Sequence, residues 1–161
     1  MTNITAQTLL DRAALSDVLH NYACGVDTRD WKLFRGLFTD DVEADFTSMS
    51  PSNMFHGADK WCEWVARSIN ALDATQHIIT NHVHKIEGDK SQSQSYLQAQ
   101  HVLRDPKGGP DMYYMIGGYY KYDMVRAGAE WKIKRYSLTI TWQTGDPGIF
   151  RLGLQRKKAA E

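Results

Sequence analysis

The sequence predicts an α+β domain in which a curved, mixed or antiparallel β-sheet is closed by about three N-terminal helices, giving a cone-like shape. Apolar residues recur at helical spacing up to about residue 72, and the rest of the chain alternates in the manner of β-strands. Helices followed by strands are typical of α+β domains, whereas α/β folds alternate the two. With 161 residues, of which 42% are hydrophobic, the chain can build one substantial core.

Three helices are expected in the first half of the chain. The first covers about residues 6–25, and Gly25 is expected to end it. Its apolar stripe consists of Leu15, Val18, Leu19, Tyr22 and Val26. A short second helix follows Asp30 as N-cap, with Trp31, Phe34 and Leu37 facing inward. The third covers 58–72 and buries Trp61, Trp64, Val65 and Ile69.

The remaining segments are predicted to be strands. They are 42–49, 75–87, 91–103, 112–125 and 130–142. Turn-forming residues at 87–90 and 126–129 indicate hairpins, and Gly117-Gly118 inside a strand indicates a bulge or a sharp bend. The domain is therefore expected to span 1–145, and 146–161 is expected to be an irregular tail that covers a pocket or contacts a neighbouring subunit.

Composition narrows the class of partner. The chain has 19 Lys and Arg residues against 19 Asp and Glu residues, so it lacks the basic surface that nucleic-acid binding requires. Cys24 and Cys62 form no metal-ligand pattern and are expected to be free thiols. No signal-peptide pattern and no apolar run of membrane-spanning length is present, so we expect a soluble, cytoplasmic protein without a membrane partner.

The histidines are sorted first by strand parity, because side chains alternate between the two faces of a sheet. His77 shares a face with Ile79, and His101 shares one with Leu97, Ala99 and Leu103, so both are expected to point inward. The same parity places His82 and His84 on the opposite face. A buried histidine is more often a satisfied core residue than a catalyst, but two on neighbouring strands suggest a site.

Asp27 is the expected partner of His77. A carboxylate on one imidazole nitrogen fixes the tautomer and stabilises the imidazolium, which suits removal of a proton from carbon next to a carbonyl. His101 or a tyrosine hydroxyl could then stabilise the enolate or protonate a departing hydroxide. The alternative is that Asp27 only caps a helix end, as Asp30 is expected to do.

The sequence also bears on a metal site and on phosphate-binding or nucleophile motifs. His82 and His84, with Glu87 nearby, have a spacing that suits a metal ion, but a polar outer strand face or an oligomer contact explains them better, and we expect neither a metal nor a cofactor. The sequence has no glycine-rich phosphate loop and no nucleophile-elbow motif. If aromatic side chains line a pocket, its ligand is small, apolar or aromatic, with a few oxygens. The residues expected to contact that ligand are Tyr22, Trp31, Phe46, Tyr114, Tyr120 and Trp142.

Four segments resemble the SnoaL-like families of the nuclear transport factor 2-like superfamily. Within this superfamily the chain is similar to the scytalone dehydratases and, more distantly, to the lindane dehydrochlorinases. The segments are 22–31, 37–41, 75–77 and 130–133. The resemblance covers about residues 9–145 and implies the cone-shaped, cystatin-like α+β fold predicted above. It also implies an acid–histidine dyad at Asp27 and His77 and a second histidine at His101.

The chain departs from both patterns at the substrate site. The two tyrosines that hold a water molecule in scytalone dehydratases correspond to Val26 and Phe46, and a substrate-binding asparagine falls near Tyr120. The lysine of the dehydrochlorinases corresponds to Tyr22, and their arginine falls near Lys121 or Tyr122. The resemblance therefore implies neither scytalone nor lindane as substrate, and Tyr22, Tyr114 or Tyr120 could supply the missing hydroxyl.

The expected function is that of a lyase, a dehydratase of a small hydroxylated compound with a carbonyl group. A ketosteroid-isomerase-like enzyme that moves the proton without expelling a group is a variant of this hypothesis. The other alternative is a non-catalytic module that binds a ligand or assembles subunits, because this fold serves many functions. The resemblance favours a homo-oligomer, a trimer over a dimer.

Overall fold

A computed structural model describes residues 4–159, which form four helices and six strands. Residues 1–3 of the expected domain and 160–161 of the expected tail lie outside the described residues. In chain order the elements are α1 (Ala6–Thr28), α2 (Trp31–Gly36), β1 (Phe38–Asp45), β2 (Met54–His56), α3 (Ala58–Ile69), β3 (Ala74–Glu87), β4 (Lys90–Leu103), β5 (Met112–Ala127), β6 (Glu130–Gly145) and α4 (Ile149–Lys158).

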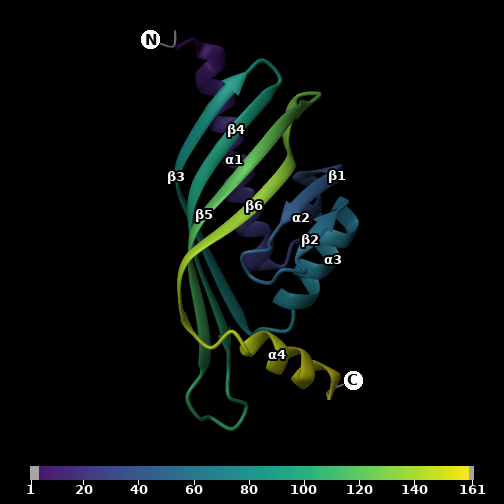
Figure 1. Cartoon of the computed structure of the whole chain (residues 1–161), viewed down its shortest axis with the longest axis vertical. Helices are drawn as coiled ribbons and strands as arrows, with labels where there is room; N and C mark the ends of the chain where they lie inside the picture. The colour runs from purple at the N-terminus through teal and green to yellow at the C-terminus, as the bar shows by residue number, and fades with distance from the viewer. Residues whose placement is uncertain (1–3, 160–161) are drawn as a thin grey trace.

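The six strands form one curved, open sheet in the order β2-β1-β6-β5-β4-β3. β1 runs parallel to β6, and the other neighbouring pairs are antiparallel. Figure 1 shows the long strands β3 to β6 curving past α1, while α2 and α3 lie beside the β1 end of the sheet. This arrangement confirms the predicted α+β fold, and the space between α1, α3 and the sheet holds the core.

Helix α1 is longer than predicted, because Gly25 does not end it. Gly25 is buried where α1 crosses α2, and a Cβ there would lie 3.2 Å from the Cβ of Phe34, so the glycine allows close packing. The helix continues to Thr28 and ends at Arg29, which adopts a left-handed conformation and donates its backbone N–H to the carbonyl of Val26. The added turn contains Asp27.

The predicted apolar faces of the helices are buried, except that Trp31 and Trp64 are half-buried, and several boundaries differ. Asp30 caps α2 as expected, since its carboxylate accepts from the N–H of Leu33 at 2.9 Å. The strand predicted at 42–49 is displaced to Phe38–Asp45, β2 was not predicted, and α3 ends at Ile69 instead of residue 72. Short edge strands and helix ends carry weak sequence signals.

A bulge in β3 overturns the predicted orientation of two histidines. Asn81 has a φ of 56°, and the pairing with β4 shifts between Thr80 and Val83. The extra residue reverses the alternation, because two residues of β3 now oppose one residue of β4. His84 consequently lies on the buried side with His77, and not on the outer face.

The predicted bulge at Gly117-Gly118 is confirmed by a shift of register between β5 and β6. Gly117 leaves room for the indole of Trp142, because a Cβ there would lie 2.0 Å from the ring. Trp142 is 46% exposed and lies on the far side of the sheet from the core.

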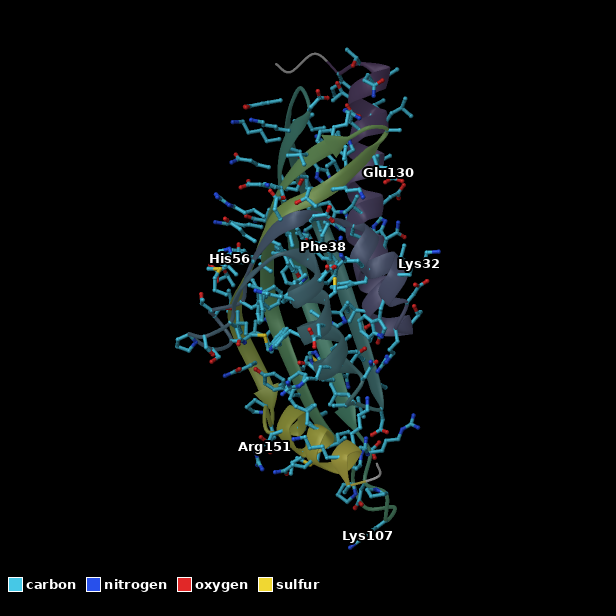
Figure 2. All side chains as sticks on the ribbon, turned by 90° about the vertical axis from the view of Figure 1, so that its right-hand side faces the viewer. Lys32, Phe38, His56, Lys107, Glu130 and Arg151 are labelled. Carbon is cyan, nitrogen blue, oxygen red and sulfur yellow. The ribbon has the colours of Figure 1, made fainter. Side chains whose placement is uncertain are left out.

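The tail is a helix and not an irregular segment. α4 packs across the end of the sheet, where Gly153 is so close to the carbonyl of Ala71 that a Cβ would lie 2.3 Å from the oxygen. Figure 2 shows Arg151 on the outer side of α4 and Lys107 at the tip of the loop between β4 and β5. The other side of α4 faces the core, which places Phe150 beside the site described below. Within residues 4–159, no helix combines the length and apolar character needed to cross a membrane.

Candidate active site

Asp27 occupies the last turn of α1 and is held by β3. Its Oδ1 accepts hydrogen bonds from His77 Nδ1 at 2.7 Å and from the Thr75 hydroxyl at 2.9 Å. Its Oδ2 accepts from the backbone N–H of His77 at 2.7 Å. Burial alone would raise the pKa of the Asp27 carboxyl, but the hydrogen bonds from His77 and Thr75 outweigh it and hold the pKa below its usual value. Asp27 is therefore a carboxylate at neutral pH.

Arg29 and Thr75 also hold the Asp27 carboxylate in position, and neither residue was predicted from the sequence. The Arg29 guanidinium donates to the backbone carbonyl of Asp27 at 2.5 Å and to that of Leu72 at 3.5 Å, which ties the end of α1 to the start of β3. It also reaches the Thr75 hydroxyl at 3.4 Å. The only sequence signal was their position beside Asp27 and His77 in the two resembling segments.

His77 is oriented as a general base. Asp27 accepts the hydrogen bond at Nδ1, so Nδ1 carries the proton and the lone pair of the neutral imidazole is on Nε2. Only 6% of the His77 side chain is exposed, and the ring lines the cavity between the helices and the sheet. A base whose lone pair faces a cavity and whose other nitrogen is fixed by a carboxylate is suited to taking a proton from a bound molecule.

His101 lies on the neighbouring strand β4, and of its two ring nitrogens Nδ1 is a donor and Nε2 is an acceptor. Its ring centroid is 5.7 Å from that of His77, and the two planes are nearly perpendicular. Its Nδ1 donates to the backbone carbonyl of Tyr114 at 3.1 Å. Burial, followed by the proximity of His77, lowers the pKa of His101 to about 4. At neutral pH His101 is uncharged, and its Nε2 has no proton to give to a leaving group.

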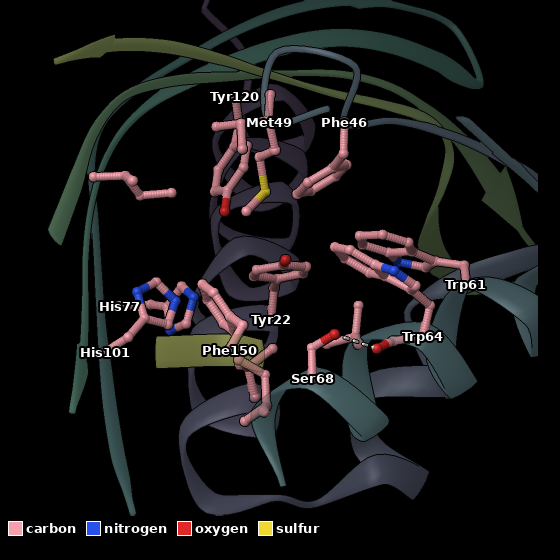
Figure 3. Close-up of a pocket in the computed structure, with 15 residues that line it drawn as sticks. Tyr22, Phe46, Met49, Trp61, Trp64, Ser68, His77, His101, Tyr120 and Phe150 are labelled. Atoms are coloured by element: carbon pink, nitrogen blue, oxygen red, sulfur yellow. Dashed lines mark hydrogen bonds between the residues drawn. The ribbon is translucent and has the colours of Figure 1, made fainter. Parts of the chain in front are cut away.

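The two histidines border a small, mostly apolar cavity of about 130 Å³. Its walls come from α1, α3, α4, the sheet and the segment after β1, as Figure 3 shows. The lining residues are Tyr22, Val26, Phe46, Met49, Trp61, Trp64, Val65, Ser68, Ile69, His77, His101, Ile116, Tyr120, Leu138 and Phe150. Few polar atoms reach this surface, so the electrostatic influence of those that do is strong.

The predicted substrate-contacting residues divide into two groups. Tyr22, Phe46 and Tyr120 line the cavity, whereas Trp31, Tyr114 and Trp142 do not. Tyr114 is buried beneath Phe150 and donates its hydroxyl to Gln143 at 2.5 Å.

Trp31 packs against Phe34 in the contact between α2 and the core, and Trp142 lies on the outer face of the sheet. Composition singles out aromatic residues, but it cannot say which side of an element they occupy.

Phe150 and Ser68 are lining residues that the sequence did not reveal. Phe150 reaches the cavity from α4, and its ring centroid lies 5.0 Å from that of His101. The Ser68 hydroxyl donates to the carbonyl of Trp64 at 2.9 Å, so it is satisfied within α3. The expected irregular tail thus supplies one wall of the cavity as part of a helix.

The second group of histidines forms a structural cluster. Both ring nitrogens of His84 are hydrogen-bonded to serine hydroxyls, Nε2 to that of Ser16 at 3.0 Å and Nδ1 to that of Ser93 at 2.7 Å. Burial, followed by the proximity of His82 and Arg12, lowers the pKa of His84 to about 4. Within residues 4–159, no three His, Cys, Asp or Glu side chains come together in a way that could hold a metal ion. The metal hypothesis for His82 and His84 therefore receives no support from this geometry.

Comparisons with known proteins agree with this fold. A family model described as a SnoaL-like domain matches residues 7–137. Terrestric acid biosynthesis cluster protein E of Penicillium crustosum is 29% identical over 150 residues, which cover 88% of this chain and 90% of that protein.

Solved structures show the same architecture. The Kfla4162 protein of Kribbella flavida has a TM-score of 0.81 at 27% identity, covering 88% of this chain and 97% of that one. A Novosphingobium aromaticivorans protein provisionally described as a scytalone dehydratase has a TM-score of 0.77 at 23% identity, covering 89% and 92%. Hexachlorocyclohexane dehydrochlorinase LinA-type3 of Novosphingobium barchaimii has a TM-score of 0.72 at 20% identity, covering 87% and 92%.

Proposed function

This chain belongs to the SnoaL-like domain family, and from that premise we propose that it is a lyase that removes water from a small cyclic compound carrying a carbonyl and a β-hydroxyl group. The observation that carries the proposal is the pairing of Asp27 with His77 at 2.7 Å, beside an apolar cavity. A satisfied core histidine needs neither an ionised partner nor a free nitrogen facing a cavity. The alternative role of Asp27, that of a simple helix cap, does not explain its three bonds to β3.

The proposed reaction begins when His77 Nε2 takes a proton from the carbon next to the carbonyl. The electron pair of the broken C–H bond forms a C=C bond, and the carbonyl becomes an enolate, while Asp27 stabilises the imidazolium. When the enolate collapses back to a carbonyl, the double bond moves to the α and β carbons and the C–O bond to the β-hydroxyl breaks. The oxygen leaves as water after it takes the proton from His77.

In this scheme His77 serves as both base and acid. The Nε2 of neutral His101 carries no proton at neutral pH, and burial raises the pKa of Tyr22 and of Tyr120, the tyrosines that line the cavity. The imidazolium formed in the first step is therefore the strongest acid beside the substrate. The expected role of His101 as proton donor is therefore replaced by that of an acceptor, which could bind a substrate hydroxyl through Nε2. The removed proton and the departing hydroxyl must lie on the same face of the substrate, since one imidazole reaches both. This predicts a syn elimination.

The size and lining of the cavity limit the substrate. An apolar cavity of about 150 Å³ is large enough for benzene, and the present cavity has about 130 Å³. The cavity is thus slightly smaller than one that holds benzene, and we infer that it takes a single ring between Phe46, Trp61 and Phe150 after small side-chain adjustments. Two structural neighbours are named as a hexachlorocyclohexane dehydrochlorinase and, provisionally, as a scytalone dehydratase; each name describes an elimination, and the first names a cyclic substrate.

The test is a panel of small cyclic β-hydroxyketones, with product followed by the ultraviolet absorbance of the conjugated ketone. We expect turnover by the wild type and a loss of at least about 100-fold in kcat for His77→Gln. His84→Gln is the matched control, because it changes a buried histidine outside the cavity and is expected to keep its rate.

Two results would change the assignment. Exchange of the substrate proton with solvent without loss of water would identify the isomerase variant. Absence of both exchange and elimination across the panel would contradict the lyase and favour a binding module.

A further inference from the structure

Four tyrosines stack in the core beside the cavity, and three of them direct their hydroxyls toward the same region. Tyr22 comes from α1, Tyr120 and Tyr122 from β5, and Tyr136 from β6. The ring centroids of Tyr22, Tyr120 and Tyr136 are 4.8 to 5.8 Å apart in each pair. Tyr122 is stacked on Tyr136 at 5.1 Å, but its hydroxyl pairs with Ser95 at 3.2 Å, away from the cavity.

The Tyr136 hydroxyl is unusual because it is buried without a hydrogen-bonding partner among residues 4–159. The neighbouring hydroxyls of Tyr22 and Tyr120 come close enough to affect its pKa, but neither makes a hydrogen bond of acceptable geometry with it. Leaving a buried hydroxyl unpaired is unfavourable, because its hydrogen bonds to water are lost on folding and not replaced. The indole N–H of Trp61, which lines the same cavity, is likewise without a partner in the described part of the chain.

The hydroxyls of Tyr22, Tyr120 and Tyr136 are all neutral donors at physiological pH. Burial raises the pKa of Tyr120 to about 12, although the hydroxyls of Tyr136 and Tyr22 oppose the rise. Burial also raises the pKa values of Tyr22 and Tyr136 far above that of an exposed phenol. Uncharged phenols in an apolar surrounding are strong donors to an anionic oxygen and remain protonated while they donate.

We propose that Tyr22 and Tyr120, backed by Tyr136, form a binding site for a carbonyl or enolate oxygen in the cavity beside His77. This inference rests on the proposed function, and it assigns to the substrate an oxygen that gains negative charge during the reaction. Figure 3 shows the Tyr120 hydroxyl projecting from the sheet toward the space between Tyr22 and His77. The Tyr22 and His77 rings are 6.4 Å apart, so one ring-sized molecule can contact both.

In this arrangement the tyrosine donors and the base His77 act on neighbouring groups of one ligand. The carbonyl oxygen takes hydrogen bonds from the tyrosines, and the adjacent carbon presents its proton to His77 Nε2. The wall positions at Val26 and Phe46 carry no hydroxyl that could do this. Tyr114, the third tyrosine considered from the sequence, is excluded because its hydroxyl is committed to Gln143.

The test uses 4-nitrophenol as a probe, because its phenolate absorbs visible light and its neutral form does not. At a pH below the probe's own pKa, the wild type is expected to bind it and to enrich the bound phenolate. Tyr120→Phe is expected to weaken binding of the phenolate by about 10- to 100-fold. Tyr122→Phe is the matched control, since it removes a buried hydroxyl from the same stack without removing one from the cavity.

Tyr136→Phe provides a second signature. Removing an unsatisfied buried hydroxyl is expected to raise the Tm of the ligand-free protein by about 2–4 °C, while the same change weakens probe binding. Stabilisation combined with loss of binding would not result from general damage to the core. A fall in Tm with unchanged binding would overturn the role of Tyr136.

Other outcomes separate this inference from the proposed function. Binding of 4-nitrophenol as the neutral phenol, with equal affinity in Tyr120→Phe and Tyr122→Phe, would overturn the oxygen site, and so would failure to bind at all. His77→Gln is expected to keep phenolate binding while it loses proton removal. If the wild type binds phenolate through Tyr120 but exchanges no substrate proton, the oxygen site stands and the lyase function fails.

Discussion

Replacing Asp27 with asparagine keeps the shape of the side chain but exchanges one acceptor oxygen for a donor. The backbone N–H of His77 can only donate, so the remaining oxygen of the new amide must face it, at the position where Oδ2 of Asp27 now accepts at 2.7 Å. The NH2 group of the amide then faces His77 Nδ1 and Thr75. Because two donors cannot pair, His77 must move its proton to Nε2 and accept at Nδ1.

The consequence is a base with its lone pair turned away from the cavity. We expect kcat to fall by about 10²- to 10⁴-fold, the range associated with loss of a general base held in its working tautomer. Asp27 accepts three hydrogen bonds, and exchanging a charged acceptor for a neutral one is expected to lower the free energy of unfolding by about 1–3 kcal/mol in total. The fold should survive this change.

Nitrogen-15 NMR of the His77 ring tests the tautomer without any substrate. At about pH 8, where an ordinary imidazole is neutral, the proton should be on Nδ1 in the wild type and on Nε2 in Asp27→Asn. Thr75→Val is a useful control, because it removes one bond to Asp27 and leaves the charge. The role assigned to Asp27 would be refuted if Asp27→Asn kept the Nδ1–H tautomer, or if it kept more than about one third of the wild-type rate.

The remaining predictions concern the closing helix and acid stability. Gly153→Ala should push α4 away from Ala71, since the added Cβ would lie 2.3 Å from the Ala71 carbonyl oxygen. We expect the free energy of unfolding to fall by about 1–3 kcal/mol and ligand binding to weaken. Arg151→Ala, on the exposed side of α4, should change neither quantity. Stability should fall as the pH drops from about 6.5 to about 4, because unfolded histidines bind protons there while buried His101 and His84, each with a pKa of about 4, do not. Each fall in pKa from 6.5 to about 4 corresponds to at most about 3–4 kcal/mol, so urea unfolding of His84→Gln should show a smaller pH dependence. An unchanged dependence would contradict the burial of His84.

The sequence predicts the parts of this fold that depend on repeated patterns. The buried stripe of α1 and the inward faces around His77 and His101 follow from periods of 3.6 and 2. The bulge at Asn81 interrupts the second period, and every orientation beyond it is reversed. Asparagine tolerates a positive φ better than most residues, but Asn81 alone gives no signal strong enough to place a bulge.

The candidate site combines local and long-range features. Asp27 and His77 are 50 residues apart, so their pairing was one of two interpretations of Asp27 from the residues alone, and the resemblance to a family strengthened it before the structure placed them together. Phe150 escaped prediction because α4 lacks a side-chain N-cap and follows a glycine-containing loop, so its start is not marked. The convergence of Tyr22, Tyr120 and Tyr136 depends on three separate elements, and no local pattern encodes it.

The most direct test of the central claim is deuterium uptake at the carbon next to the carbonyl, measured by proton NMR in D₂O on the panel of cyclic β-hydroxyketones. We predict that the wild type exchanges or eliminates this proton for at least one compound, and that His77→Gln slows the process by at least about 100-fold while His84→Gln does not. A wild-type protein that leaves the proton untouched throughout the panel, or a His77→Gln variant that works at the wild-type rate, would contradict the assignment of His77 as the general base.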